Sequence, residues 1–328
     1  MKVVSLVFIF LLLAGCQKQI CSDQPNSNLL EINIEVNRLE KSLFRSSNPE
    51  DVARFLEENE DMAQSMFHQE EYPNQEILAN QIFMLIQNEA IDTLYQEADK
   101  AFDQPAFEKQ MNLSLSWLKY YFPNASIPMV ETVVTGFYND LVISKEKIII
   151  GLDFFIGENA TFRPLDIPQY ILNRYDQRYL VPSILKFYVA DYVSSGDEET
   201  LLSEMIDYGK IYYLLGNIMP CTPDRLIIGY TPKEIMDVSA FQELIWSRII
   251  EQDILYATDE FTKRKFIGER PNAIELGDEC PGRIGAWIGW QVVKNYMDET
   301  GSTMQQLMAN RNHHDIFSKS GYKPKNIR

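Results

Sequence analysis

Apolar residues recur at spacings of three and four through most of the first 125 residues, which predicts a series of amphipathic helices. The best-marked helix runs through Val52, Phe55 and Leu56, because Ser47 or Asn48 can cap it and Pro49 suits its first turn. We expect an antiparallel helical layer with a structural role. Its further helices are predicted over Asp61–His68, Asn74–Gln87, Ile91–Lys100 and Pro105–Phe122.

The pattern changes after Pro128, where β-branched residues become frequent. Two runs, Met129–Phe137 and Lys147–Phe155, have the composition of strands, and the residues 138–146 between them can add a third. We therefore predict a small β-meander. Asp153 falls within an apolar strand, where an unpaired carboxylate is costly, and we favour a cap on the following Gly157 loop over a catalytic role.

Longer helical patterns follow Pro168, so the chain is predicted to be α+β and mostly helical, with the β-meander packed against helices. The helical region 31–125 and the α+β region 126–328 are expected to form one compact body. Three glycines, Gly282, Gly285 and Gly289, leave one helix face without side chains, and we interpret that face as a close packing contact. The helices are predicted over Val181–Val193, Glu198–Leu214, Pro232–Tyr256 and Arg283–Asp298.

The beginning of the chain has the features of a secretory leader. Residues 1–15 contain one lysine and then an apolar run, and Leu13-Ala14-Gly15-Cys16 resembles the lipobox of bacterial lipoproteins. That resemblance implies cleavage before Cys16 and acylation of this cysteine. Residues 16–30 are predicted to be a flexible tether, because their polar composition cannot bury a core. We expect a membrane-anchored body in the cell envelope, at the outer membrane or the periplasmic face.

Charge and cysteine content narrow the possible partners. The chain has 30 basic and 47 acidic residues, a formal charge of −17, and no basic run of five, which argues against a nucleic-acid partner. No CxxC or CxxH spacing occurs, and we expect no metal and no cofactor. Cys221 and Cys280 can pair with each other or remain buried thiols, and the sequence leaves both possibilities open.

Few side chains suggest a catalytic or metal-binding role. Glu204 and Asp207 share a helix face and could form an acid–base pair, but a solvated face is favoured. His313-His314-Asp315 could hold a metal, although its polar surroundings favour a surface loop. We identify no catalytic residue. Speculative binding residues are aromatic or cationic side chains on two helices, with core packing as the default for the aromatic ones: Tyr208, Lys210, Trp287 and Trp290, together with the neighbouring Tyr212 and Tyr213.

Several sequence blocks in a fixed order resemble the gliding-motility lipoprotein GldB family of Bacteroidetes. The blocks are IIIGLDFFIG, PQYILNRYDQRYLVPSIL, LLSEMIDYGKIYYL, LIIGYTPKEI and CPGRIGAWIGWQVVKNYM. The resemblance spans nearly the whole mature chain. It implies a lipid-anchored envelope protein required for gliding, which works with other gliding and secretion proteins and has no established enzymatic activity.

The same blocks are similar, more faintly, to zinc peptidases of the HExxH type, in which two imidazoles four residues apart hold one metal. The corresponding helix of this chain, Tyr179–Val193, contains no histidine. The similarity therefore implies a degenerate zinc-peptidase-like architecture, a pseudoenzyme. We predict a non-catalytic component of gliding motility, and the alternative is an envelope hydrolase with an unrecognised site.

Overall fold

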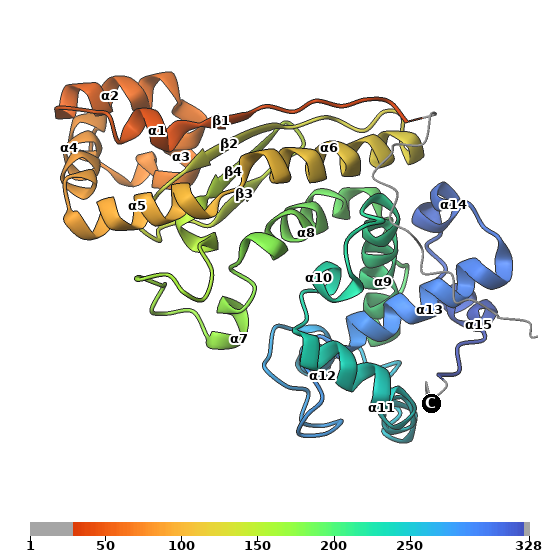
Figure 1. The fold of residues 1–328 in the computed structure, drawn as a ribbon. Coiled ribbons are helices and arrows are strands. Elements are labelled where there is room, and N and C mark those ends of the chain that lie inside the picture. Colours follow the sequence, from red (N-terminus) through yellow and green to blue (C-terminus); the bar gives the residue numbers. More distant parts are fainter. Residues whose placement is uncertain (1–28, 325–328) are drawn as a thin grey trace, which may run out of the picture.

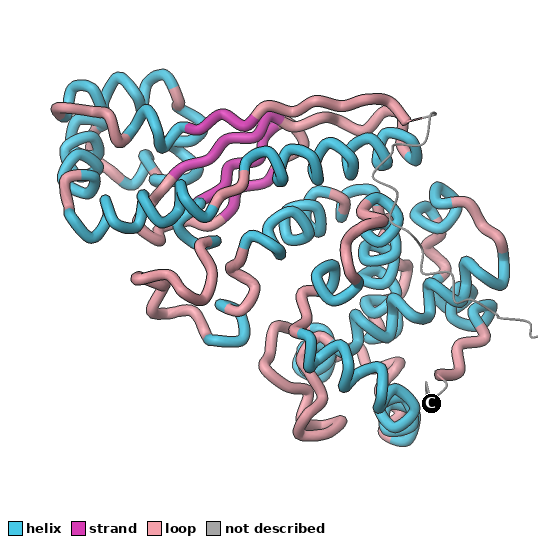
Figure 2. Tube along the Cα trace, in the orientation of Figure 1, coloured by secondary structure: helices cyan, strands magenta, loops and turns pink. Residues whose placement is uncertain are grey.

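Four strands form one mixed sheet, and helices cover both of its faces (Figure 1; Figure 2). The structure is a computed structural model that describes residues 29–324, so the leader, Cys16 and most of the tether lie outside the described residues. The α+β, mostly helical prediction is confirmed. The strands are β1 (Val36–Arg38), β2 (Met129–Val133), β3 (Leu141–Ile143) and β4 (Lys147–Gly151).

The strand order β1-β2-β4-β3 corrects the predicted β-meander. Strand β2 pairs with both β1 and β4 in parallel, and only β3 and β4 form an antiparallel hairpin. The hairpin turn is closed by the Ser144 amide, which donates to the Lys147 carbonyl at 2.8 Å. Strand β1 was missed, and it brings residues from the predicted helical region into the same sheet as residues 126–151.

The first helices pack against one face of this sheet. Asn48 caps α2 by accepting a hydrogen bond from the Asp51 amide at 2.8 Å, as the sequence predicted. Val133 and Ile149 point into the cluster that these helices bury, because alternate residues of a strand face opposite sides. The elements of this half are α1 (Leu39–Leu43), α2 (Pro49–Glu58), α3 (Glu60–Phe67), α4 (Gln75–Ile86), α5 (Glu89–Ala101) and α6 (Gln104–Tyr121).

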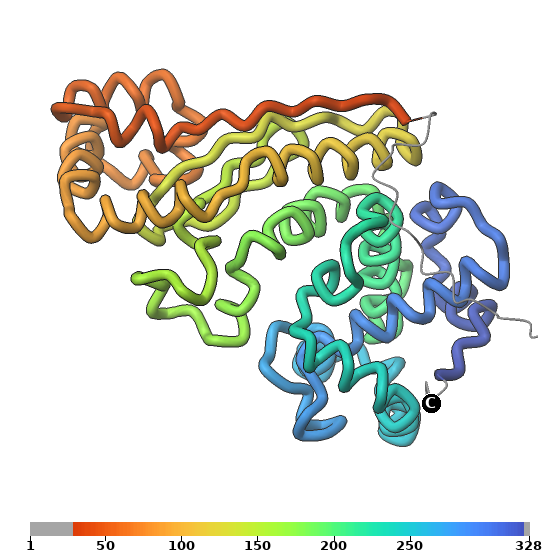
Figure 3. Tube along the Cα trace, in the orientation of Figure 1, coloured from red at the N-terminus to blue at the C-terminus, as the bar shows by residue number. Residues whose placement is uncertain are grey.

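The opposite face of the sheet carries Ile148 and Ile150, which belong to the main core shared with α6 and the later helices. Figure 3 shows the first described residues running beside α6 before they enter β1. Two backbone amides hold this segment there: Ile34 donates to Asn112 Oδ1 at 2.8 Å, and Val36 donates to Glu108 Oε1 at 3.2 Å. The segment around Ile34 and Val36 is thus part of the folded body.

Asp153 does not cap the Gly157 loop, contrary to our prediction. It lies in a single 3₁₀ turn, Leu152–Phe155, and its carboxylate accepts from the amides of Thr135 and Phe137 at 3.2 and 2.6 Å. Burial raises the pKa of this carboxyl to about 6, although these hydrogen bonds oppose the shift. Asp153 therefore fastens the turn that follows β2.

The second half is helical. The long helices match the predicted ones to within a few residues, whereas the short α7, α10, α12, α14 and α15 were not predicted. The elements are α7 (Gln169–Leu172), α8 (Gln177–Tyr188), α9 (Leu201–Ile218), α10 (Asp224–Ile228), α11 (Pro232–Glu251), α12 (Glu260–Ile267), α13 (Ile284–Thr300), α14 (Met304–Ala309) and α15 (His313–Ser320). No helix within residues 29–324 combines the length and the apolar character that crossing a bilayer requires.

Helices α9 and α13 cross with their backbones in contact. A β-carbon on Gly289 would overlap the Met205 carbonyl, and one on Gly209 would overlap the Gly289 carbonyl. Glycine is needed at both positions because any side chain would push the helices apart. The close packing contact predicted from the glycines is confirmed for Gly289.

We expect Gly289→Ala to lower the free energy of unfolding by about 3 kcal/mol, because the added methyl group meets rigid backbone. Gly216→Ala, also on α9, is the matched control, since its β-carbon would lie 3.5 Å from the Trp290 ring, an ordinary contact. The control should change stability by no more than about 1 kcal/mol. Urea denaturation measures both, and equal midpoints for the two variants would contradict the close-packing account.

Candidate functional site

Lys210, on α9, is completely buried, and its ammonium group is fully hydrogen-bonded. Its Nζ donates to the carbonyls of Ser194 and Asn310 at 3.1 and 2.5 Å and contacts His313 Nε2 at 2.9 Å. Three acceptors match the three N–H groups of an ammonium. Burial lowers the pKa of Lys210 to about 8, and the nearby Asp207 carboxylate opposes that shift.

His313 joins this cation to a serine. Its Nδ1 lies 2.8 Å from Ser203 Oγ, and Asp207 Oδ1 lies 3.1 Å from Nε2. A proton on Nε2 lets the ring pair with Asp207 and accept from Ser203, and a proton on Nδ1 lets it accept from Lys210 and donate to Ser203. A serine hydrolase needs the first arrangement, in which the imidazole accepts the proton of the hydroxyl.

The Ser203–His313 pair is also closed to solvent. Ser203 is 3 % exposed and His313 is 5 % exposed, and a β-carbon on Gly196 would overlap both side chains. The prediction of a surface loop at His313-His314-Asp315 was wrong for His313, since these residues begin α15 and His313 faces inward. The cluster of Ser203, Asp207, Lys210 and His313 therefore joins α9 to α15 as buried structure.

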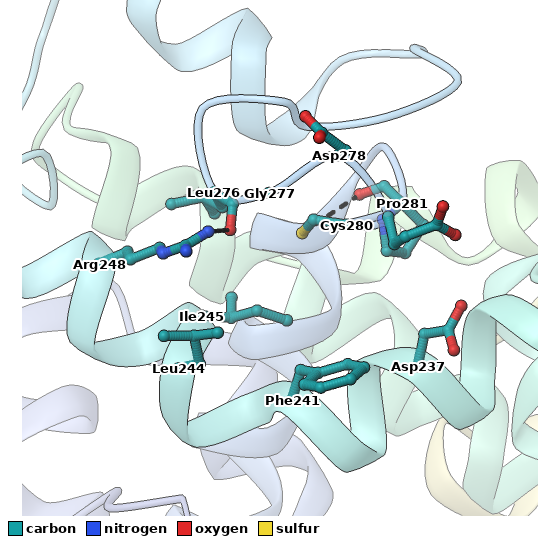
Figure 4. Close-up of a pocket in the computed structure, with 11 residues that line it drawn as sticks. Asp237, Phe241, Leu244, Ile245, Arg248, Leu276, Gly277, Asp278, Cys280 and Pro281 are labelled. Carbon is teal, nitrogen blue, oxygen red and sulfur yellow. Dashed lines mark hydrogen bonds between the residues drawn. The ribbon is translucent and has the colours of Figure 1, made fainter.

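An apolar groove lies on a different surface, between α11 and the loop of residues 271–281 (Figure 4). Phe241 and Leu244 lie on the side of α11 facing the loop and are 52 % and 47 % exposed. Leu276 and Pro281 form the facing wall, and the groove has a volume of about 230 Å³. Large apolar side chains that remain exposed beside a cavity are typical of protein-binding surfaces.

The loop that forms this wall is held firmly against α11. The Arg248 guanidinium donates to the Leu276 carbonyl, and Gln252 donates to the Glu275 carbonyl at 3.1 Å. Within the loop, the Ala273 amide donates to the Cys280 carbonyl at 2.7 Å. The groove is therefore preformed, which lowers the conformational cost of binding.

Cys280 is a free thiol buried at this groove, whereas Cys221 is disulfide-bonded. The two cysteines therefore do not pair with each other, which settles one question that the sequence left open. Burial raises the pKa of the Cys280 thiol to about 12, with Arg248 as a smaller opposing influence. A thiol in this environment stays protonated and unreactive near neutral pH.

The four speculative binding residues occupy different environments. Trp287 and Trp290 are buried in the core, and Trp290 packs against Tyr212 with ring centroids 5.7 Å apart. Lys210 lies in the buried cluster described above, and Tyr208 lines a second, polar pocket beside α8 and α12. Glu204 does not pair with Asp207. It forms an ion pair with Lys263, whose Nζ lies 2.6 Å from Glu204 Oε1.

In the part of the chain that the structure describes, no three His, Cys, Asp or Glu side chains gather closely enough to hold a metal ion. The helix that would correspond to an HExxH helix is α8, and Pro182 lies inside it.

Comparison with known proteins gives one clear result. The sequence model of a family described as gliding motility protein GldB matches residues 21–324. No curated protein and no solved structure matches the chain, so the degenerate zinc-peptidase-like architecture stays a prediction. The family match covers the described body almost completely, and the chain therefore belongs to the GldB family of gliding-motility lipoproteins.

Proposed function

We propose that this GldB-family protein is a non-catalytic, lipid-anchored component of the gliding apparatus that binds a partner protein in the groove between α11 and residues 271–281. Membership of the GldB family supports a role in gliding motility, and the exposed apolar groove is the observation that supports binding of a partner protein. The occupant is a segment of another gliding or secretion envelope protein. Its apolar side chains contact Phe241 and Leu244.

The charges around the groove favour a basic residue in that segment. Asp237, Asp278 and Glu279 line the groove, and Lys233 bridges two of them, Asp237 at 2.8 Å and Glu279 at 2.5 Å. Asp278 makes no ion pair with another described residue and is exposed. A lysine or arginine next to the apolar side chains of the partner would complement the Asp278 carboxylate.

The non-catalytic part of the proposal is supported by the buried His313 cluster. The Ser203 and His313 side chains are buried, and the Gly196 backbone lies directly against both, so the cluster offers no access for a substrate. The alternative, an envelope hydrolase with an unrecognised site, could use this cluster only with Ser203 as an exposed nucleophile.

Replacing Phe241, the aromatic residue of the groove, tests whether the groove binds a partner protein. Phe241→Asp should abolish colony spreading while the folded protein stays at its normal level, because a charge in an apolar contact is costly. Met84→Asp, on α4 at the other end of the body, is the matched control, since Met84 is 73 % exposed and should tolerate the change.

A photo-crosslinker placed at residue 241, and at 84 as control, identifies the partner. Support requires a crosslink specific to 241 that maps to an apolar segment carrying a lysine or arginine. Normal spreading of the Phe241→Asp strain, or the same crosslinks from both positions, would refute the groove as the binding surface.

The anchor is tested separately. Cys16→Ala should move the protein from the membrane fraction to the soluble fraction and abolish spreading, because no acyl chain can be attached. Cell fractionation and a spreading assay measure the two effects. A variant that fractionates with membranes and glides normally contradicts the lipid anchor.

The non-catalytic proposal and a hydrolase that uses Ser203 make different predictions for this residue. We expect Ser203→Ala to cost about 1–2 kcal/mol in unfolding free energy, because His313 loses its hydrogen-bond partner, and to leave spreading intact. Chemical denaturation and the spreading assay measure these outcomes. Loss of spreading at unchanged stability would instead favour the hydrolase.

A further inference from the structure

A second pocket, distinct from the groove, lies where α8, α9, α12 and the start of α13 meet. We call it the basic pocket, and its volume is about 230 Å³. Three cationic side chains reach it from three different elements: Lys186 from α8, Arg264 from α12 and Arg283 from the residue before α13. Tyr208 and Tyr212 of α9 also line the pocket.

Arg283 is fixed in place by the fold. It has a positive φ of 59°, and its guanidinium donates to the carbonyls of Ile228 and Gly229 at 2.5 and 3.0 Å. The same group lies over the Tyr230 ring, 5.2 Å from the centroid, and its Nε is 3.4 Å from Glu269 Oε2. The lining of the pocket therefore includes a positive charge, on Arg283, whose position is fixed.

Lys186 and Arg264 differ from Arg283 because neither has an ion-pair partner among the described residues. Neither side chain makes an ion pair or a hydrogen bond with any residue between 29 and 324, and Lys186 Nζ lies over the Phe187 ring, 4.5 Å from its centroid. Lys186 is partly buried, and this burial, with Arg283 as a smaller cause, lowers its pKa to about 8. A bound anion would relieve both effects.

The carboxylates near the pocket are already used. Arg174 binds Glu269 through two hydrogen bonds of 2.9 and 2.7 Å, and Lys263 pairs with Glu204 and Glu260, each at 2.6 Å. Three cations, Lys186, Arg264 and Arg283, line the pocket with two carboxylates, Glu204 and Glu269, an excess of one positive charge in a chain of formal charge −17. Such a local reversal of charge is typical of a site for an anion.

We propose that the basic pocket binds an anionic group, a carboxylate or a phosphate, between Lys186, Arg264 and Arg283. The Tyr208 hydroxyl, which is hydrogen-bonded to no other described residue, is positioned to supply a further donor. Arginine and lysine together suit this chemistry, since the guanidinium fork orients the oxygens and the ammonium adds charge. The volume admits a small molecule or the end of a side chain.

The test is isothermal titration calorimetry of the mature protein in detergent, with inorganic phosphate and glutarate as the two probes. We expect at least one probe to bind, and Lys186→Met and Arg264→Gln each to weaken that binding about tenfold, as for the loss of one charge-assisted hydrogen bond. Lys100→Met is the matched control, because this exposed lysine lies on α5, away from the pocket. The probe that binds more tightly shows whether the pocket prefers a phosphate or a carboxylate.

The site is refuted if neither probe binds at millimolar concentration. Equal weakening by Lys100→Met would also refute it, because the effect would then be one of overall charge. Circular dichroism confirms that the variants fold, which we expect because both side chains are at least partly exposed. The measurement needs neither membrane nor partner protein, so its failure leaves the proposed function in place.

Discussion

Helices α9 and α13 meet backbone to backbone at Gly209 and Gly289, and both polar sites of the second half depend on this contact. One face of α9 presents Ser203, Asp207 and Lys210 to α15, while a neighbouring face presents Tyr208 and Tyr212 to the basic pocket. Helix α13 begins directly after Arg283, so the distance between the two helices also sets where the guanidinium lies. A wider crossing would separate the parts of each site.

The helices with clear apolar periodicity and capping residues could be predicted from the sequence, because local interactions determine where they begin and end. Asn48 before Pro49 is the clearest example. The strand pairing could not be predicted. Neighbouring strands joined by short segments usually run antiparallel, yet β2 and β4 are parallel because β3 lies between them in sequence and at the edge in space. The alternation of Ile32, Ile34 and Val36 was an available signal for β1.

The sites were less accessible to sequence reasoning, since they are assembled from distant segments. His313 was assigned to the surface from its polar neighbours, but burial is decided by α9, a hundred residues earlier. Tyr208 was selected for its residue type, and it does line a pocket. Lys186 carried no signal, because an unpaired lysine differs from a surface lysine only in what surrounds it in space. The groove likewise needs the loop of residues 271–281 to lie against α11.

The position of β1 has a mechanical consequence, because it determines how the body responds to a pull on its first described residues. Tension applied at residue 29 acts along the axis of β1, which is parallel to β2, and the amides of Ile34 and Val36 are bonded to α6. The hydrogen bonds across that ladder are then sheared together, and none is peeled open before its neighbours. Shear geometry resists force better than peeling, so the sheet and α6 resist a pull on residue 29 as one unit.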